Sequence, residues 1–235
     1  MKKHNKVVSL LLASALVLGL AGSSTAMAQP SYYGQYLCNY PGFTCVKVHR
    51  GDTWESLFPN QRDRELVKRL NRTNMRVGYR TWIVVPTNLR QISNLDLSPF
   101  PLTMQTNGQK LIYVSLSKQA FGAYSASGQL VHWGPVSAGR GYCPDTGRPG
   151  CNTVTGNFKV FRKQGPECIS SKFPLETNGG AHMPYCMHFN GGFALHGSTL
   201  PGYNASHGCV RMFFDDAQWL NQHFINIGTP VRIVQ

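Results

Sequence analysis

The hydrophobic period of the chain changes near residue 109, and this change most constrains the fold. From Gln109 onward, short β-rich runs are separated by turns that contain Gly or Pro, which is typical of β-strands. The expected strands are 111–116, 130–136, 157–162, 193–196 and 230–234. One helix is expected over 215–225, with acidic residues in its first turn and an apolar side formed by Phe214, Ala217, Leu220 and Phe224. We therefore predict a mainly β domain over 109–235 with a late packing helix.

A smaller unit precedes this domain. Its expected elements are a strand over 46–48, a helix from Trp54 capped by the turn Gly51-Asp52-Thr53, a helix over 62–71 and a strand over 81–85 that ends at Pro86. These form a strand-helix-helix-strand unit over 46–86, near the lower size limit for independent folding. An N-terminal segment over 29–45 precedes it, and a linker over 87–108 follows. All four tryptophans are expected in cores: Trp54, Trp82, Trp133 and Trp219.

The first 28 residues are predicted to be a cleaved secretory signal peptide. Three lysines precede an apolar run over 7–21, and small residues follow up to Ala28. The alternative is a retained anchor, but this run is shorter than the roughly 20 residues that a membrane-spanning helix needs. We expect export across the inner membrane to the periplasm or cell wall, with no stable membrane span.

The charge of the chain is strongly positive, with 23 Lys and Arg against 10 Asp and Glu. The signal peptide accounts for only three of the basic residues, so the exported protein is expected to be drawn to anionic envelope polymers. Nucleic acid is excluded as a partner by export. The charge does not form one obvious site, because solvated helix faces explain many of the basic residues.

Seven cysteines remain after cleavage, and an odd number in an exported chain indicates one free thiol or a partner molecule. The number of cysteines alone cannot give the pairing. Local spacing favours the pairs Cys38–Cys45, Cys143–Cys151 and Cys168–Cys186. Cys209 would then be the free thiol.

The sequence around Cys209 is typical of a nucleophile. Cys209 follows a glycine in a tight polar turn, where neighbouring main-chain N–H groups can bind an oxyanion. His196, thirteen residues earlier, can reach it if the intervening loop folds back. A thiolate–imidazolium pair would lower the thiol pKa and give a nucleophile near neutral pH. The alternative is a structural disulfide, common for a cysteine in a secreted protein.

His196-Gly197-Ser198, followed by Ser206-His207-Gly208-Cys209-Val210-Arg211, resembles the signature of YkuD-type L,D-transpeptidases. Further stretches resemble family positions in family order: Ser117-Lys118-Gln119, Val136-Ser137-Ala138-Gly139-Arg140, Thr155-Gly156-Asn157-Phe158, Met183-Pro184-Tyr185 and Gly228-Thr229-Pro230-Val231. The resemblance covers about 110–235. It implies a β-sandwich-like catalytic domain.

The resemblance also implies roles for single residues. Cys209 would be the acylated nucleophile and His196 its base. A main-chain carbonyl or small hydroxyl residue beside His196 would orient the imidazole, which here means Gly197 or Ser198. His207, Gly208 and Cys209 would supply the oxyanion-side main chain, with Ser206 in the same turn. Arg211 would bind a substrate carboxylate or brace the loop, and Tyr185 would contact substrate or fill a core.

The unit over 46–86 resembles a LysM module, a small domain that binds peptidoglycan or chitin. The resemblance rests on Val48, Gly51-Asp52-Thr53, Trp54, Leu57, Leu70-Asn71, Asn74, Gly78 and Val85-Pro86. The basic second helix departs from the family and could bind an anionic polymer instead of sugar. The alternative is a small α/β cap with ordinary turn chemistry.

The reaction that these resemblances imply is acyl transfer on peptidoglycan stem peptides, with no cofactor. The acceptor would be another stem peptide, a lysine of a wall-anchored protein, or water in an L,D-carboxypeptidase. The competing functions are an amidase on the same peptides and a non-catalytic wall-binding or host-interaction protein. His182 and His188 lie near Cys186, but no HExxH or paired CxxC spacing supports a metal site.

Overall fold

The computed structural model describes residues 32–235. The predicted signal peptide over 1–28 lies outside the described residues, as do residues 29–31 of the N-terminal segment. Within residues 32–235, no helix combines the length and the apolar character that crossing a membrane requires.

The smaller unit, called the βααβ unit below, has the predicted strand-helix-helix-strand order. It consists of β1 (Phe43–Lys47), α1 (Trp54–Leu57), α2 (Gln61–Leu70) and β2 (Trp82–Pro86), with short 3-10 turns η1 (Gln35–Asn39) and η2 (Val77–Tyr79). β1 and β2 pair antiparallel. Thr53 caps α1 as expected, because its hydroxyl accepts the Ser56 N–H while the Ser56 hydroxyl accepts the Thr53 N–H. The fully buried Val67 and Ile83 join the helices to the strands in one small core.

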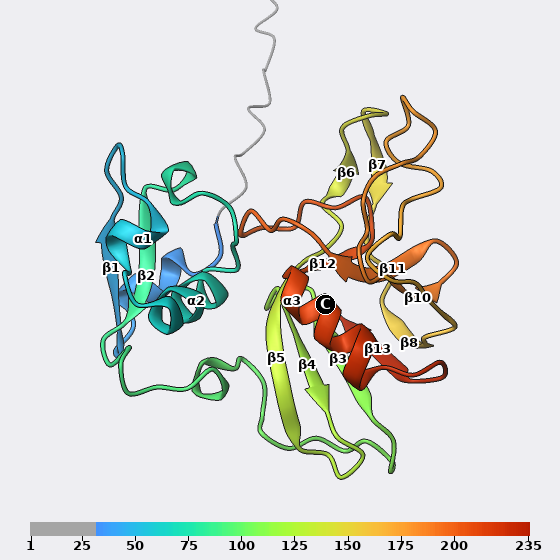
Figure 1. Cartoon of the computed structure of the whole chain (residues 1–235), viewed down its shortest axis with the longest axis horizontal. Coiled ribbons are helices and arrows are strands. Elements are labelled where there is room, and N and C mark those ends of the chain that lie inside the picture. Colours follow the sequence, from blue (N-terminus) through green and yellow to red (C-terminus); the bar gives the residue numbers. More distant parts are fainter. Residues whose placement is uncertain (1–31) are drawn as a thin grey trace, which may run out of the picture.

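The larger domain is built on one curled nine-stranded sheet in the order β8-β13-β3-β4-β5-β12-β11-β10-β9 (Figure 1). Its strands are β3 (Leu111–Ser115), β4 (Ala120–Tyr124), β5 (Leu130–Ser137), β8 (Gly156–Lys159), β9 (Arg162–Lys163), β10 (Met187–Asn190), β11 (Phe193–Gly197), β12 (Val210–Met212) and β13 (Pro230–Val234). The ring centroids of Phe158 on β8 and Phe189 on β10 lie 5.4 Å apart. The sandwich-like arrangement that we predicted is therefore a single sheet whose ends approach each other. A separate hairpin of β6 (Gly141–Cys143) and β7 (Arg148–Cys151) projects from it.

The late helix lies where the sequence predicted it. α3 (Phe214–Trp219) runs directly into a π-helical turn, η4 (Leu220–Phe224). Ala217 and Leu220 are fully buried and join the main core with strand residues that include Leu195 and Met212. The helix thus packs under the strands that carry the His196 and Cys209 region.

Residues 87–108, expected to be a linker, pack on the larger domain. They include a 3-10 turn, η3 (Leu95–Leu97). Phe100 is buried against Tyr124 and Trp133, and the Trp133 indole N–H donates to the carbonyl of Asn94. The segment is therefore part of a hydrophobic core under β3, β4 and β5.

The three predicted disulfides are confirmed. They are Cys38–Cys45, Cys143–Cys151 and Cys168–Cys186, and Cys209 is free. The first pins η1 to β1. The second closes the β6–β7 hairpin, and the third closes the long loop before β10.

A buried ion pair joins the two parts of the molecule. Arg69 of α2 donates two hydrogen bonds, of 2.8 and 2.7 Å, to Asp216 of α3, and His132 of β5 binds the same carboxylate at 2.7 Å. Burial by itself raises the pKa of Asp216, but the Arg69 charge and the hydrogen bonds from His132 and Arg69 outweigh it and hold the pKa below its ordinary value. Asp216 is therefore an anion in the folded protein at neutral pH.

Arg72 makes a second buried connection between the parts. Its guanidinium donates to the carbonyls of Arg69 and Lys118 and to the Tyr33 hydroxyl, and it lies 5.0 Å from the Trp133 ring. The residue is only 1% exposed. Because this buried cation contacts both the N-terminal part of the protein and the larger domain, it holds the smaller unit against that domain.

We predict that Asp216→Asn lowers the free energy of unfolding at neutral pH by about 3 kcal/mol, because Arg69 loses its buried counter-charge. Since the folded pKa of Asp216 is depressed, its contribution is complete above the ordinary carboxyl pKa of about 3.9 and is lost as pH falls through the folded value. Urea unfolding at several pH values measures both effects. Asp215→Asn, an exposed neighbour on α3, should cost less than about 1 kcal/mol. Equal costs for the two variants would contradict this account.

Candidate active site

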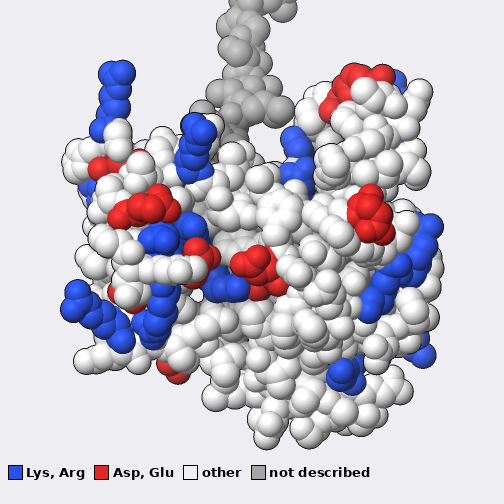
Figure 2. Space-filling view, in the orientation of Figure 1, with Lys and Arg blue, Asp and Glu red and all other residues white. Residues whose placement is uncertain are grey.

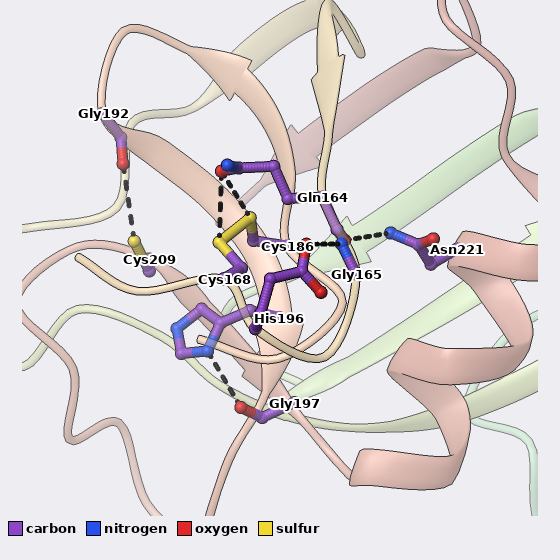
Figure 3. Close-up of a disulfide and its surroundings, with 10 residues drawn as sticks. Gln164, Gly165, Cys168, Cys186, Gly192, His196, Gly197, Cys209 and Asn221 are labelled. Carbon is purple, nitrogen blue, oxygen red and sulfur yellow. Dashed lines mark hydrogen bonds between the residues drawn. A yellow bond between two sulfur atoms is a disulfide. The ribbon is translucent and has the colours of Figure 1, made fainter. Parts of the chain in front are cut away.

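His196 lies on β11, and Cys209 directly precedes the neighbouring parallel strand β12. β11 and β12 pair in the register Leu195↔Val210 and His196↔Arg211. Cys209 immediately precedes β12 and so stands beside Ala194. The loop between His196 and Cys209 folds back, which is the condition that the sequence analysis set for His196 to reach Cys209. The two residues thus lie in one region of the sheet (Figure 3).

The His196 imidazole is oriented by a main-chain carbonyl. Its Nδ1 lies 3.0 Å from the carbonyl oxygen of Gly197, and the residue is 5% exposed. Because a carbonyl only accepts, Nδ1 carries the proton and Nε2 has a free lone pair. The choice that the sequence left open is thus decided for Gly197. Ser198 uses its main chain instead, with its N–H donating to Met212.

Burial sets the charge state of His196. It lowers the pKa of His196 to about 4; the Gly197 hydrogen bond opposes this shift, and the charges of Arg211 and His188 add to it. The imidazole is therefore neutral at pH 7. In that state it can accept a proton at Nε2.

The Cys209 thiol is also neutral in this arrangement. Burial raises the pKa of the thiol, although the Ala194 N–H and the Arg211 charge act in the opposite direction. Its sulfur lies 3.7 Å from the Gly192 carbonyl oxygen (Figure 3) and packs against a cluster that contains the Cys168–Cys186 disulfide. The two pKa shifts favour a neutral thiol and a neutral imidazole over the thiolate–imidazolium pair that we expected.

The turn before Cys209 is held by hydroxyl groups. The Ser206 hydroxyl accepts the Gly208 N–H at 2.9 Å and donates to the Cys209 carbonyl at 2.6 Å. Thr153 donates to the Gly208 carbonyl at 2.6 Å and accepts from Gly139. The Gly208 N–H is therefore engaged and is not the free oxyanion donor that we expected. No sequence pattern pointed to Thr153.

Glycine is required at position 208. Its φ is 137°, and a Cβ there would lie 2.6 Å from the Phe193 ring and 3.1 Å from the Asn152 carbonyl oxygen. A side chain would thus both strain the backbone and push Phe193 away. The Gly208-Cys209 order of the motif follows from this close packing.

The His207 side chain connects the two disulfide-closed loops. Its Nε2 bonds the Asp145 carboxylate of the β6–β7 hairpin, and its ring stacks on Phe173 with centroids 4.5 Å apart. Asp145 and Phe173 were missed by the sequence interpretation, because loops carry no periodic signal. The side chain of His207 thus has a bracing contact on each side.

The family model for the L,D-transpeptidase catalytic domain, YkuD, matches residues 109–233, more than half of the chain. The chain belongs to the YkuD family of L,D-transpeptidases.

The solved structure of another L,D-transpeptidase agrees with this assignment. The crystal structure of an L,D-transpeptidase from Xylanimonas cellulosilytica has a TM-score of 0.56 and 26% identity, and covers 80% of this chain and 97% of its own. An L,D-transpeptidase from Mycobacterium tuberculosis has a TM-score of 0.43 and 23% identity, covering 54% of this chain and 57% of its own. One from Stackebrandtia nassauensis has a TM-score of 0.45 and 21% identity, covering 59% and 61%. Comparison with curated proteins finds no match.

Arg211 of this L,D-transpeptidase is available to an anion. Among the described residues, no hydrogen bond or ion pair ends on its half-buried guanidinium. Burial lowers the pKa of Arg211, and the nearby charge of Arg140 lowers it further. The two roles that the sequence left open for Arg211, binding a substrate carboxylate and bracing the loop, stay predictions.

Tyr185 of this L,D-transpeptidase was expected either to contact substrate or to fill a core. Tyr185 is half-buried and packs against the main core, which favours the packing role over substrate contact. The preceding Pro184 reaches the site through its carbonyl, which accepts the Gly197 N–H at 2.9 Å.

Within residues 32–235, no cluster of three or more His, Cys, Asp or Glu side chains could hold a metal ion.

We predict that iodoacetamide labels Cys209 slowly at neutral pH and faster as pH passes the ordinary thiol pKa of about 8.5, because the raised pKa keeps the thiol protonated. Intact mass, followed from about pH 6 to about pH 10, gives the rate. One label is expected, since the other six cysteines are paired. A rate that is already maximal at pH 7 would show a thiolate–imidazolium pair and contradict the neutral state.

Proposed function

We propose that the protein is a secreted L,D-transpeptidase that acts on peptidoglycan stem peptides through a thioester on Cys209. The parallel pairing of β11 and β12 supports this most directly. Among residues 32–235, it brings the one free thiol to the same region as a buried histidine whose Nε2 makes no hydrogen bond. We place the enzyme in the periplasm or at the cell wall.

In the first step, the Cys209 sulfur attacks the carbonyl of the third stem residue, and its proton passes to Nε2 of His196. The thiol first rotates away from the Gly192 carbonyl. Because both groups are neutral beforehand, proton transfer accompanies the attack. The amide bond to the terminal D-alanine then breaks, and its amine takes the proton back from His196. The products are a thioester and free D-alanine, so protons and bonds balance.

In the second step, an amine attacks the thioester and the Cys209 sulfur leaves. The amine comes from the diamino acid of another stem peptide or from a lysine of a wall-anchored protein. Attack by water would make the enzyme an L,D-carboxypeptidase. Arg211 binds the carboxylate of the donor peptide, which is the nearest anionic group of such a substrate. An amidase would cut the same peptides at a different bond.

We predict that residues 29–235, incubated with purified disaccharide-tetrapeptide, release D-alanine and form cross-linked dimers. Cys209→Ala should form neither product above background. Mass spectrometry of the products identifies the acceptor, since trimmed tripeptides without dimers would indicate water. A wild-type protein that leaves the tetrapeptide intact while still binding the wall would favour the non-catalytic binding function and contradict the proposal.

The βααβ unit is proposed to bind wall glycan, as its LysM-like sequence implies. It and the preceding η1 turn carry four exposed aromatic side chains: Tyr36, Tyr40, Tyr79 and Trp82. Trp82, which we expected in a core, is 43% exposed. Flat aromatic side chains on a surface can stack against sugar rings, so this unit has the surface chemistry for a glycan.

The basic residues of α2 fit an anionic polymer less well. Arg62 and Arg64 donate to main-chain carbonyls, Lys68 pairs with Glu65, and Arg69 pairs with Asp216. On the face shown in Figure 2, cationic side chains over this unit lie among acidic ones. The positive charge of α2 is thus used largely within the molecule.

We predict that Trp82→Ala in a Cys209→Ala background weakens binding to purified insoluble peptidoglycan by about tenfold, since one stacking aromatic contributes roughly 0.5–1.5 kcal/mol beyond its area. Co-sedimentation measures the bound fraction. Phe161→Ala, an exposed aromatic of the larger domain, should bind as the parent does. Binding that is unchanged by Trp82→Ala but abolished by salt would show an anionic polymer as the ligand instead.

A further inference from the structure

We propose that the βααβ unit is a positioning element of the active site, and that Asn74 positions the segment 198–208 between His196 and Cys209. Only the kinetic test of this proposal rests on the proposed function, because it measures D-alanine release. Asn74 lies between α2 and β2, in the part of the unit that faces the larger domain.

The chain that leaves His196 runs to the βααβ unit before it returns to Cys209 (Figure 1). Along this path, four main-chain carbonyls accept hydrogen bonds from the N-terminal part of the protein. The pairs are Asn74 to Ser198 at 3.0 Å, Thr73 to Leu200 at 2.9 Å, Arg80 to Pro201 at 3.0 Å and Tyr33 to Gly202 at 2.7 Å. The segment therefore takes its hydrogen bonds from another part of the molecule.

Asn74 binds this segment at two points with one side chain. Its Nδ2 donates to the Ser198 carbonyl at 3.0 Å, and its Oδ1 accepts the Leu200 N–H at 2.8 Å. The main-chain N–H of Asn74 also donates to the Leu200 carbonyl at 3.3 Å. Leu200 is fully buried, so its polar groups cannot turn to water if these bonds are lost. The unit is thus required for this backbone conformation.

The hydrogen bonds of Asn74 to Ser198 and Leu200 lie close to the catalytic pair. Ser198 lies two residues after His196, and its N–H donates to the Met212 carbonyl on β12 at 2.9 Å. On the opposite side, the Ser137 hydroxyl of β5 donates to Tyr203 at 2.7 Å and accepts from Ala205 at 3.0 Å. The returning chain is held between β5 and the unit. Asn74 therefore fixes where β11 ends and from where the turn to Cys209 begins.

The test compares purified Asn74→Ala with the wild-type chain. We expect kcat for D-alanine release to fall about tenfold or more, with KM within about twofold, because misplacement of the catalytic pair affects the chemical step. We also expect the pH profile of Cys209 alkylation to shift toward the ordinary thiol pKa, because a loosened segment admits water. The thiol would thus become more reactive to a small reagent while the enzyme becomes slower.

Asn88→Ala is the matched control, since Asn88 is an exposed asparagine of the segment after β2. It should leave both readouts unchanged. Asn74→Asp keeps the acceptor for Leu200 but loses the donor to Ser198, so it should shift both readouts in the same directions by a smaller amount. It also provides the test if Asn74→Ala does not fold.

Wild-type values of kcat and of the alkylation profile in Asn74→Ala would overturn the proposal. A lower melting temperature with an unchanged alkylation profile would do the same, because it shows a purely structural role. If the wild-type protein itself has no turnover, the proposed function fails. The alkylation profile then decides the positioning role by itself.

Discussion

The parallel pairing of β11 with β12 is the constraint on which the rest of the structure depends. Parallel neighbours cannot be joined by a tight hairpin, so the chain between His196 and Cys209 must leave the sheet and return. The main chain of this segment needs hydrogen-bond partners, and residues of β5 and of the βααβ unit provide them. The Arg69–Asp216 pair holds the unit where these bonds can form. The geometry of the site therefore depends on the contact between the βααβ unit and the larger domain.

Burial of the site determines how its chemistry proceeds. The same desolvation lowers the pKa of His196 and raises that of Cys209, so the protein holds a neutral base and a neutral thiol. The Gly197 carbonyl fixes the tautomer that leaves Nε2 free. Burial and the nearby charge of Arg140 both lower the pKa of Arg211. In the proposed mechanism, charge therefore develops only once the substrate is bound.

Much of this could be predicted from the sequence. Most strands with clear β-rich runs, the late helix, the capped helix at Trp54 and the three disulfides lie where local patterns placed them. The run 157–162 was expected to form one strand, but it is divided between β8 and β9, which lie at opposite ends of the sheet. β4 was missed because all of its residues are buried and two are alanines and one glycine, which gives no alternation. β12 has three residues, too few for any period. Contacts between distant loops, such as Asp145 with His207 or Asn74 with Ser198, depend on the tertiary fold and leave no local signal.

The most direct test of the account is to trap the acyl-enzyme. The protein is mixed with tetrapeptide donor at low concentration without an added acceptor, quenched in acid, and examined by intact mass and peptide mapping. The account predicts an added mass equal to the donor minus D-alanine, located on the peptide that contains Cys209 and removed by hydroxylamine, as a thioester should be. An adduct on any other residue, or D-alanine release with no adduct in either the wild-type protein or a His196→Ala variant, would contradict a cysteine acyl-transfer mechanism.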